Sequence, residues 1–176
     1  MRVKKKPVWL LLIVCGIVLI ATILFLINDT PEMTAERFAK RCGPVWDAAY
    51  ETMATWRNSV SRGETMPDPV RSIFDIDRSL ESISISYDGA ARFTFDWHNA
   101  GPEKSRYVYW QKNDDYWQTH AVAWLLPSSE RYNEQIQAEE NENSLKLTGF
   151  GAGKKGYLII TRLCPCWFFS EEYNPT

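Results

Sequence analysis

The sequence predicts an α+β protein with an N-terminal transmembrane helix, then one long kinked helix packed on an antiparallel sheet of about six or seven strands. Three observations predict this arrangement. A run of twenty residues near the N-terminus has no charged side chain. The next part of the chain repeats apolar residues at the 3.6-residue period of a helix, and the part after residue 80 repeats them at the two-residue period of strands. A helix followed by a series of strands is typical of the α+β class.

The uncharged run covers residues 8–27 and reads VWLLLIVCGIVLIATILFLI. A bilayer core of about 30 Å requires a helix of about 20 apolar residues, so we expect this segment to anchor the protein in a membrane. Two alternatives stay open. A cleaved secretory signal would have a shorter apolar stretch that ends in small residues. A lipidated Cys15 would follow a small residue, whereas the chain has Val14 there.

Charges on the two sides of this segment predict its orientation. Four basic residues precede it, whereas Asp29 and Glu32 follow it before the first base, Arg37. The positive-inside rule therefore places the N-terminus in the cytoplasm and the C-terminal domain outside, at the cell membrane. The predicted parts are a cytoplasmic basic tail, a membrane anchor, the helical segment of an extracytoplasmic domain and the sheet part of the same domain, at residues 1–7, 8–27, 28–62 and 63–176.

The predicted extracytoplasmic part has the composition of one folded, acidic domain. Residues 28–176 contain 16 of the 20 lysines and arginines and all 22 acidic residues, a net charge of −6. Nucleic-acid binding needs a clustered excess of positive charge, so we exclude that class of partner. Domains most often have about 100–150 residues, which matches a single domain here.

The helical segment begins with Thr30 as the expected cap and Pro31 at the first helical position. Pro44 interrupts the pattern, since proline lacks an N–H group and crowds the preceding turn; we expect a kink there, or two helices that share one buried face. We expect the helix to end at Gly63. The predicted buried stripe consists of Phe38, Cys42, Val45, Ala49, Met53, Trp56 and Val60.

After a linker at residues 64–70, strands begin with two runs of alternating apolar and polar residues. Asp88 and Gly89 lie between them, and this pair favours a tight hairpin turn because the central residues need positive φ. Residues 127–144 are polar and are expected to form a short surface helix or a loop. The further expected strands are residues 106–111, 116–126, 145–150, 157–163 and 167–172.

Neither a nucleotide site nor a metal site is predicted. Residues 151–156 read GAGKKG, but a strand-like run follows where a dinucleotide fingerprint requires a helix. Asp96, His98 and His120 show no metal-ligand spacing and are expected in or near loops. No serine-hydrolase motif occurs either. We therefore expect no catalytic residue, no cofactor and no metal.

Three cysteines lie in the predicted extracytoplasmic part. Cys164 and Cys166 flank Pro165 between two strand-like runs, so the helix N-terminus that activates a thioredoxin-like thiol is missing. We expect a turn here, near the kink at Gly43 and Pro44. A disulfide between Cys42 and either Cys164 or Cys166 is then a candidate, and redox chemistry at the cysteine pair is the alternative.

The aromatic residues allow two interpretations. Tyr109, Trp110, Tyr116 and Trp117 lie on both sides of predicted strands, so they cannot all face one helix. They belong either to the core, which we favour, or to an exposed binding surface.

These observations favour a single-pass, membrane-anchored domain that acts by binding, without catalysis of its own. Its expected partner is another envelope protein or an extracellular ligand. The alternative is an extracytoplasmic enzyme or thiol-active protein that uses Cys164 and Cys166, or Asp96 with the two histidines, His98 and His120.

Overall fold

The computed structural model describes residues 13–19, 30–87, 89–97, 104–112, 137–150, 153 and 155–175. The chain divides into two compact units, residues 1–34 and 35–176. In the first unit residues 13–19 are helical, and the rest of the predicted anchor lies outside the described residues. No helix in the described part of the chain is both long enough and apolar enough to cross a membrane.

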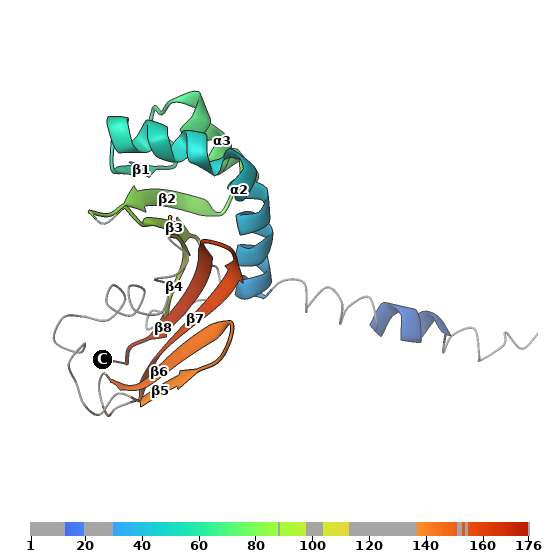
Figure 1. Ribbon diagram of the computed structural model, residues 1–176. Helices are drawn as coiled ribbons and strands as arrows, with labels where there is room; N and C mark the ends of the chain where they lie inside the picture. The colour runs from blue at the N-terminus through green and yellow to red at the C-terminus, as the bar shows by residue number, and fades with distance from the viewer. Residues whose placement is uncertain are drawn as a thin grey trace, which may run out of the picture. The chain divides into compact units, whose positions relative to one another are not determined.

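Helix α2 (Pro31–Trp56) begins as predicted. The hydroxyl Oγ1 of Thr30 accepts a hydrogen bond from the N–H of Met33 at 3.4 Å, and the Thr30 carbonyl accepts one from Thr34 at 3.0 Å. Pro44 lies inside the helix, and Figure 1 shows α2 changing direction near its middle. The structure therefore has one continuous, bent helix, the first of the two forms that the sequence allowed.

The buried stripe of α2 differs from the predicted one at two positions. Phe38, Cys42, Ala49 and Met53 are buried as expected, but Val45 is 42% exposed and Trp56 is 37% exposed. Trp46 takes the place predicted for Val45 and is 1% exposed. Both positions fit the helical period after Cys42, so periodicity alone does not distinguish them. The larger indole fills the space above the sheet, where its ring contacts Phe93, Trp110 and Trp167.

The chain between the predicted helix and the predicted hairpin contains two further elements. The helix ends at Trp56 instead of Gly63, and the next residues form strand β1 (Ser59–Ser61). Helix α3 (Asp68–Ile76) occupies part of the predicted linker and the residues after it. It buries Val70, Ile73 and Phe74, the i, i+3, i+4 pattern of an amphipathic helix.

The sheet has eight antiparallel strands among the described residues, instead of about six or seven, in the order β1-β2-β3-β4-β8-β7-β6-β5. Six of the predicted strands are present; β1 and β5 are additional, and the predicted strand at residues 116–126 lies outside the described residues. The strands after β1 are β2 (Leu80–Ile85), β3 (Ala91–Phe95), β4 (Lys104–Trp110), β5 (Gln137–Glu140), β6 (Ser144–Phe150), β7 (Gly156–Cys164) and β8 (Trp167–Tyr173).

The predicted hairpin is formed by β2 and β3, which pair as antiparallel neighbours. Gly89 has a φ of 84°, in the left-handed region that glycine adopts easily. Its carbonyl accepts a hydrogen bond from the hydroxyl of Tyr50 at 3.0 Å, so α2 holds the hairpin turn in place.

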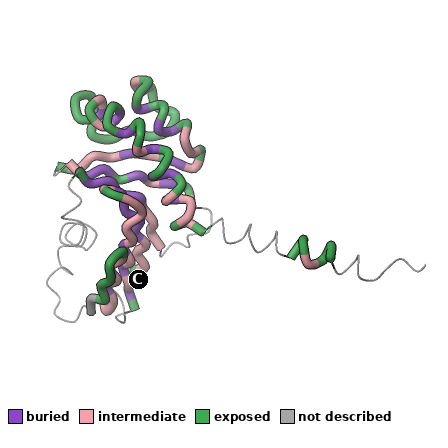
Figure 2. The backbone as a smooth tube through the Cα atoms, turned by 45° about the vertical axis from the view of Figure 1, so that its right-hand side comes forward, coloured by how far each residue is buried: buried purple, intermediate pink, exposed green. Residues whose placement is uncertain are grey.

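The core lies on both faces of the sheet. On the helix side, side chains of α2 and α3 pack on a paired row of apolar residues: Val60, Ile83, Phe93, Val108 and Phe169. A second buried cluster lies on the opposite face and consists of Tyr109, Leu145, Leu147, Leu158, Ile160 and Phe168. Figure 2 shows buried residues along the strands of the sheet. In β3 and in the first part of β7 they alternate with more exposed ones, whereas β4 and β8 each have a continuous buried stretch where both faces of the sheet are covered.

Candidate functional site

Two rows of paired side chains cross the sheet on the helix side, next to the apolar row that ends at Phe169. The first row consists of Thr148, Tyr157, Tyr173 and Lys104, and the second of Lys146, Ile159, Glu171 and Arg106. They share a face with Phe169 because side chains two residues apart point to the same side of a strand. We call these eight residues the polar aromatic face.

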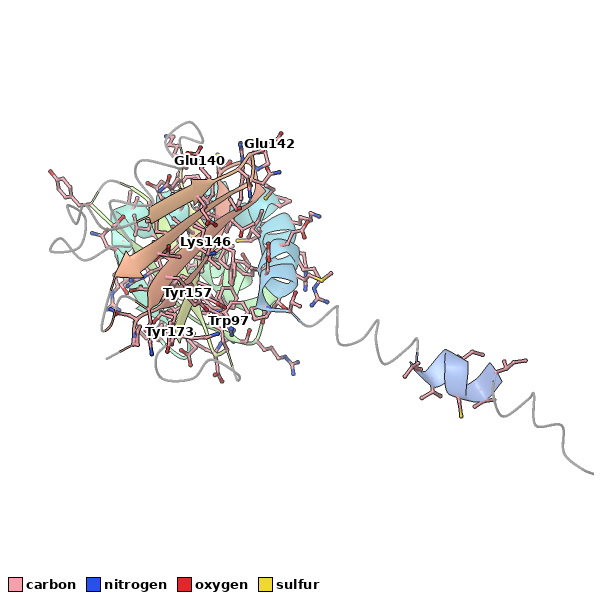
Figure 3. All side chains as sticks on the ribbon, turned by 90° about the horizontal axis from the view of Figure 1, so that it is seen from below. Trp97, Glu140, Glu142, Lys146, Tyr157 and Tyr173 are labelled. Carbon is pink, nitrogen blue, oxygen red and sulfur yellow. The ribbon has the colours of Figure 1, made fainter. Side chains whose placement is uncertain are left out.

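The cluster beneath α2 and α3 contains Phe169 and, at its margin, Trp97, but no residue of the polar aromatic face. The side chains of Lys104 and Lys146 are 37% and 45% exposed. In Figure 3, Lys146, Tyr157, Tyr173 and Trp97 follow one another across the sheet, and α2 stands to one side. The face is therefore partly open to solvent, although it continues the core side of the sheet.

Glu171 is the centre of a hydrogen-bonded network on this face. Its Oε2 accepts a hydrogen bond from Nε of Arg106 at 2.6 Å, and its Oε1 accepts one from the hydroxyl of Tyr157 at 2.7 Å. Nζ of Lys104 lies 3.9 Å from the same Oε1. The side chains of Arg106 and Glu171 are only 11% and 20% exposed, so water screens this ion pair less than a surface pair.

The network sets the protonation states of its members. Partial burial alone would raise the pKa of the Glu171 carboxyl, but the hydrogen bonds from Tyr157 and Arg106, with the charges of Arg106 and Lys104, outweigh it and lower that pKa. Burial, and then the hydrogen bond to Glu171, raise the pKa of the Tyr157 hydroxyl. At neutral pH the face therefore holds an ionised carboxylate and a protonated phenol that donates to it.

Aromatic rings surround the network. The ring centroids of Tyr157 and Tyr173 are 5.5 Å apart with 31° between their planes, and Nζ of Lys104 lies 6.0 Å from the Tyr157 centroid. Trp97 packs against Phe169 and donates a hydrogen bond from Nε1 to the Arg106 carbonyl at 3.2 Å. Lys104 therefore lies beside the tyrosine pair, and Trp97 is held beside the backbone of Arg106.

The guanidinium group of Arg106 donates to Glu171 through Nε. Its Nη1 atom is buried and has no hydrogen-bond partner in the part of the chain that the structure describes. A buried charged donor without an acceptor is destabilising, and in native proteins such an atom calls for a water, an ion or a ligand.

Two of the four aromatic residues that the sequence placed either in the core or on a binding surface lie in the described part of the chain. Tyr109 and Trp110 are each 8% exposed, the first in the cluster opposite α2 and the second beneath α2. The core interpretation is therefore correct for both residues. Tyr116 and Trp117 lie outside the described residues.

The turn at Cys164 and Cys166 has the predicted position. β7 pairs with β8 through this turn, and a Cβ atom on Gly43 would lie 3.8 Å from Nε1 of Trp167, the first residue of β8. Both cysteines pack against the core cluster that contains Cys42. The structure shows no disulfide among these three cysteines, so a disulfide from Cys42 to either of the other two stays a prediction.

The thiols lack the features of a reactive pair. Burial raises the pKa of Cys42 far above its usual range. Burial also raises the pKa values of Cys164 and Cys166, and the positive charges of Lys40 and Arg162 offset this only in part. Since the thiolate is the nucleophile, these cysteines are poorer nucleophiles at neutral pH than a free cysteine.

The other motifs can be placed only in part. Asp96 directly follows β3, whereas His98 and His120 lie outside the described residues. Among the residues that the structure does describe, no group of three histidine, cysteine or acidic side chains could hold a metal ion. Gly156, the last residue of the GAGKKG motif, begins β7, so a strand follows the glycines as predicted.

Sequence reasoning did not single out any residue of the polar aromatic face. A signal was present, because alternation places Glu171 and Tyr173 on the same face as Phe169, and an ionisable residue on a core face is unusual. Its partner Arg106 could not be identified in the same way, since it lies 65 residues away and the β4–β8 pairing was not predicted.

Comparisons of the chain with protein-family models, with curated proteins and with solved structures give no match.

Proposed function

We propose that the protein is a single-pass membrane protein whose α+β domain lies outside the cytoplasm and acts by binding, without catalysis of its own. Residues 8–27 form the anchor, with the N-terminus in the cytoplasm. The domain recognises an extracellular ligand or another envelope protein, and the polar aromatic face is its binding surface.

The observation that carries this proposal is the composition of the two rows beside the α2 core. A sheet face that only had to pack would continue with apolar residues, as the row ending at Phe169 does. Instead it presents two tyrosines with Lys104, Arg106 and Glu171, a mixture of rings and charges that suits recognition. The raised thiol pKa values at Cys164 and Cys166 favour this function over thiol chemistry.

Topology is tested by a reporter that is active only outside the cytoplasm, fused after Thr176. We expect activity from this fusion, and loss of activity when the four N-terminal basic residues are moved to follow Ile27. Equal activity of the two fusions would contradict the orientation that we propose.

Binding is tested by a photo-crosslinking amino acid placed at Tyr173, in membranes of the source organism. We expect an adduct at this position but none at Val45, which is 42% exposed on α2 and serves as the control. The adduct should disappear when Tyr157→Ala is added, because the two rings are neighbours. An adduct at both positions, or at neither, would refute binding through this face.

A further inference from the structure

We infer that the polar aromatic face binds an acidic oligosaccharide, with the ring stack of Tyr157 and Tyr173 beneath a sugar ring and the basic side chains beside its carboxylate. This inference rests on the proposed binding function of the same face and names the chemical class of its ligand.

The rings provide a platform for a sugar. The C–H groups on one side of a pyranose ring form a flat apolar surface that packs on an aromatic face, while its hydroxyl groups stay at the rim. Tyr157 and Tyr173 lie in adjacent strands, and their rings stack with centroids 5.5 Å apart and 31° between the planes. Both side chains are partly exposed, so the stacked pair offers an aromatic surface on which a sugar ring can pack. Thr148 continues the same row with a hydroxyl group.

The charge of the face favours an acidic ligand. It contains three basic side chains, Lys104, Arg106 and Lys146, and one acidic side chain, Glu171. Glu139, which pairs with Lys146 in the neighbouring strand β5, extends the same row, so the excess is one positive charge. Nζ of Lys146 lies 3.5 Å from Oε2 of Glu139. Nζ of Lys104 lies 3.9 Å from Oε1 of Glu171, which already accepts a hydrogen bond from the Tyr157 hydroxyl. Residues 28–176 as a whole carry a net charge of −6. This local excess of positive charge is thus the exception in an acidic domain and matches a carboxylate.

Arg106 gives an independent reason for a ligand with acceptor atoms. Its Nε donates to Glu171, yet its buried Nη1 has no acceptor in the described part of the chain. Guanidinium groups pair best with two oxygen atoms in the same plane. Nη1 is itself enclosed, so a ligand carboxylate at the margin of the face would interact with it through the charge of the guanidinium group or through a bridging water.

The position of the face favours a glycan over a peptide. Extended peptides usually add to the edge of a sheet, and helical peptides need an apolar groove. The polar aromatic face crosses β6, β7, β8 and β4, which lie inside the sheet, whereas β1 and β5 are its edge strands among the described residues. It is also charged along its length. A flat platform with polar margins therefore fits a sugar chain better than either kind of peptide.

The test measures binding to the full chain in detergent micelles by isothermal titration calorimetry. The probes are hexasaccharides of hyaluronan and of polygalacturonic acid, which carry carboxylates, and the neutral hexasaccharide of chitin. We expect at least one acidic probe to bind at least tenfold more tightly than the neutral one. Raising the salt concentration should weaken this binding, because exposed charges contribute to it.

Two variants and their matched controls assign the binding to the face. Tyr173→Ala should abolish binding, whereas Tyr87→Ala, which changes a fully exposed tyrosine elsewhere, should leave it unchanged. Lys104→Gln should weaken binding of the acidic probe at least tenfold, whereas Lys112→Gln, at an exposed lysine after β4, should not. Urea unfolding of each variant shows whether the fold is retained.

The outcomes separate this inference from the proposed function. If no acidic probe binds, or if the neutral probe binds equally well, the inference is wrong. If the crosslink at Tyr173 then yields an adduct that protease removes, the face still binds, but its partner is a protein. If neither a probe nor an adduct is found, both the inference and the proposed function fail.

Discussion

The helix side of the sheet contains two regions that share strands β4 and β8 but differ in chemistry. In the first, Phe93, Val108 and Phe169 form a paired row that is at most 5% exposed and lies beneath α2. In the second region, two residues further along β4 and β8, the paired residues are Arg106 and Glu171. The comparison shows that strand residues on the same face of the sheet are apolar where a helix covers them. Where no helix covers that face, they are mostly polar or charged.

Charged residues are tolerated in the second region because they are paired and partly solvated. A buried charge without a partner is strongly destabilising, whereas Glu171 accepts two hydrogen bonds and stays 20% exposed. We assign stability chiefly to the covered region and binding to the partly open one. Each of the following predictions tests this division.

The largest effect is expected in the covered region. Phe93→Ala should lower the free energy of unfolding by about 3–5 kcal/mol, because it removes a buried ring that contacts Phe38, Trp46 and Trp167. Urea unfolding measures the loss. Tyr87→Ala is the control and should change stability by less than about 0.5 kcal/mol. A loss below about 1 kcal/mol for Phe93→Ala would mean that the row is not the core.

An intermediate effect is expected in the Glu171 network. Glu171→Ala should destabilise by about 1–3 kcal/mol, because it leaves Nε of Arg106 and the hydroxyl of Tyr157 without their acceptor. The same unfolding measurement serves here. A loss as large as that of Phe93→Ala would contradict the division between the two regions.

The pH dependence of this loss has a defined sign. The folded state lowers the pKa of Glu171, so its ionised form adds stability above the unfolded-state pKa of about 4.3. That contribution is lost as the pH falls through the lower pKa of the folded state. The stability difference between the wild type and Glu171→Gln should therefore shrink on acidification. A difference that is the same at neutral and acidic pH would argue against an ionic role.

The thiols test the covered region without a mutation. Cys42 is completely buried, so it should react with iodoacetamide only after the protein unfolds. Cys164 and Cys166 should react slowly at neutral pH and faster as the pH rises, because burial raises their pKa values. Mass spectrometry of the alkylated protein provides the readout. Rapid labelling of either cysteine at pH 7 would instead favour the thiol-active alternative.

The smallest effect is expected at Trp56. It is 37% exposed at the end of α2, where the Arg57 guanidinium lies 5.1 Å from its ring centroid. Trp56→Ala should therefore cost less than about 1 kcal/mol, although the helical period of the sequence predicts a buried ring there. A loss of about 3–5 kcal/mol in urea unfolding would mean that the Trp56 ring is buried, as the helical period predicts.

Local signals in the sequence were sufficient for much of the fold. The cap at Thr30, the bend at Pro44, the β2–β3 hairpin and the turn at Cys164 and Cys166 each depend on a few neighbouring residues. Their physical causes are capping, a missing N–H group and turn geometry, which act within one segment of the chain.

The missed elements lack such signals or have misleading ones. Strand β1 has three residues, and β5 contains two adjacent glutamates, so neither shows a clear alternation. Pro67 and Pro69 made α3 look like a linker, although proline is favoured at the start of a helix.

The candidate site could not be predicted because it depends on register between distant strands. Arg106 meets Glu171 only because β4 pairs with β8, and Tyr157 joins them only because β7 pairs with β8. A shift of one residue in either pairing would move these side chains to the other face. No local pattern determines such a register.

The central claim, that the two rows beside the α2 core bind and the covered rows stabilise, is tested most directly by NMR of the tyrosine rings. The full chain with ¹³C-labelled tyrosine, in micelles, is titrated with whichever of the two acidic hexasaccharides binds more tightly in the calorimetry. The account predicts that the signals of Tyr157 and Tyr173 shift while those of Tyr50, beneath the hairpin, and Tyr87, at its exposed tip, stay unchanged. Shifts at Tyr50 or Tyr87 without shifts at Tyr157 and Tyr173 would contradict it.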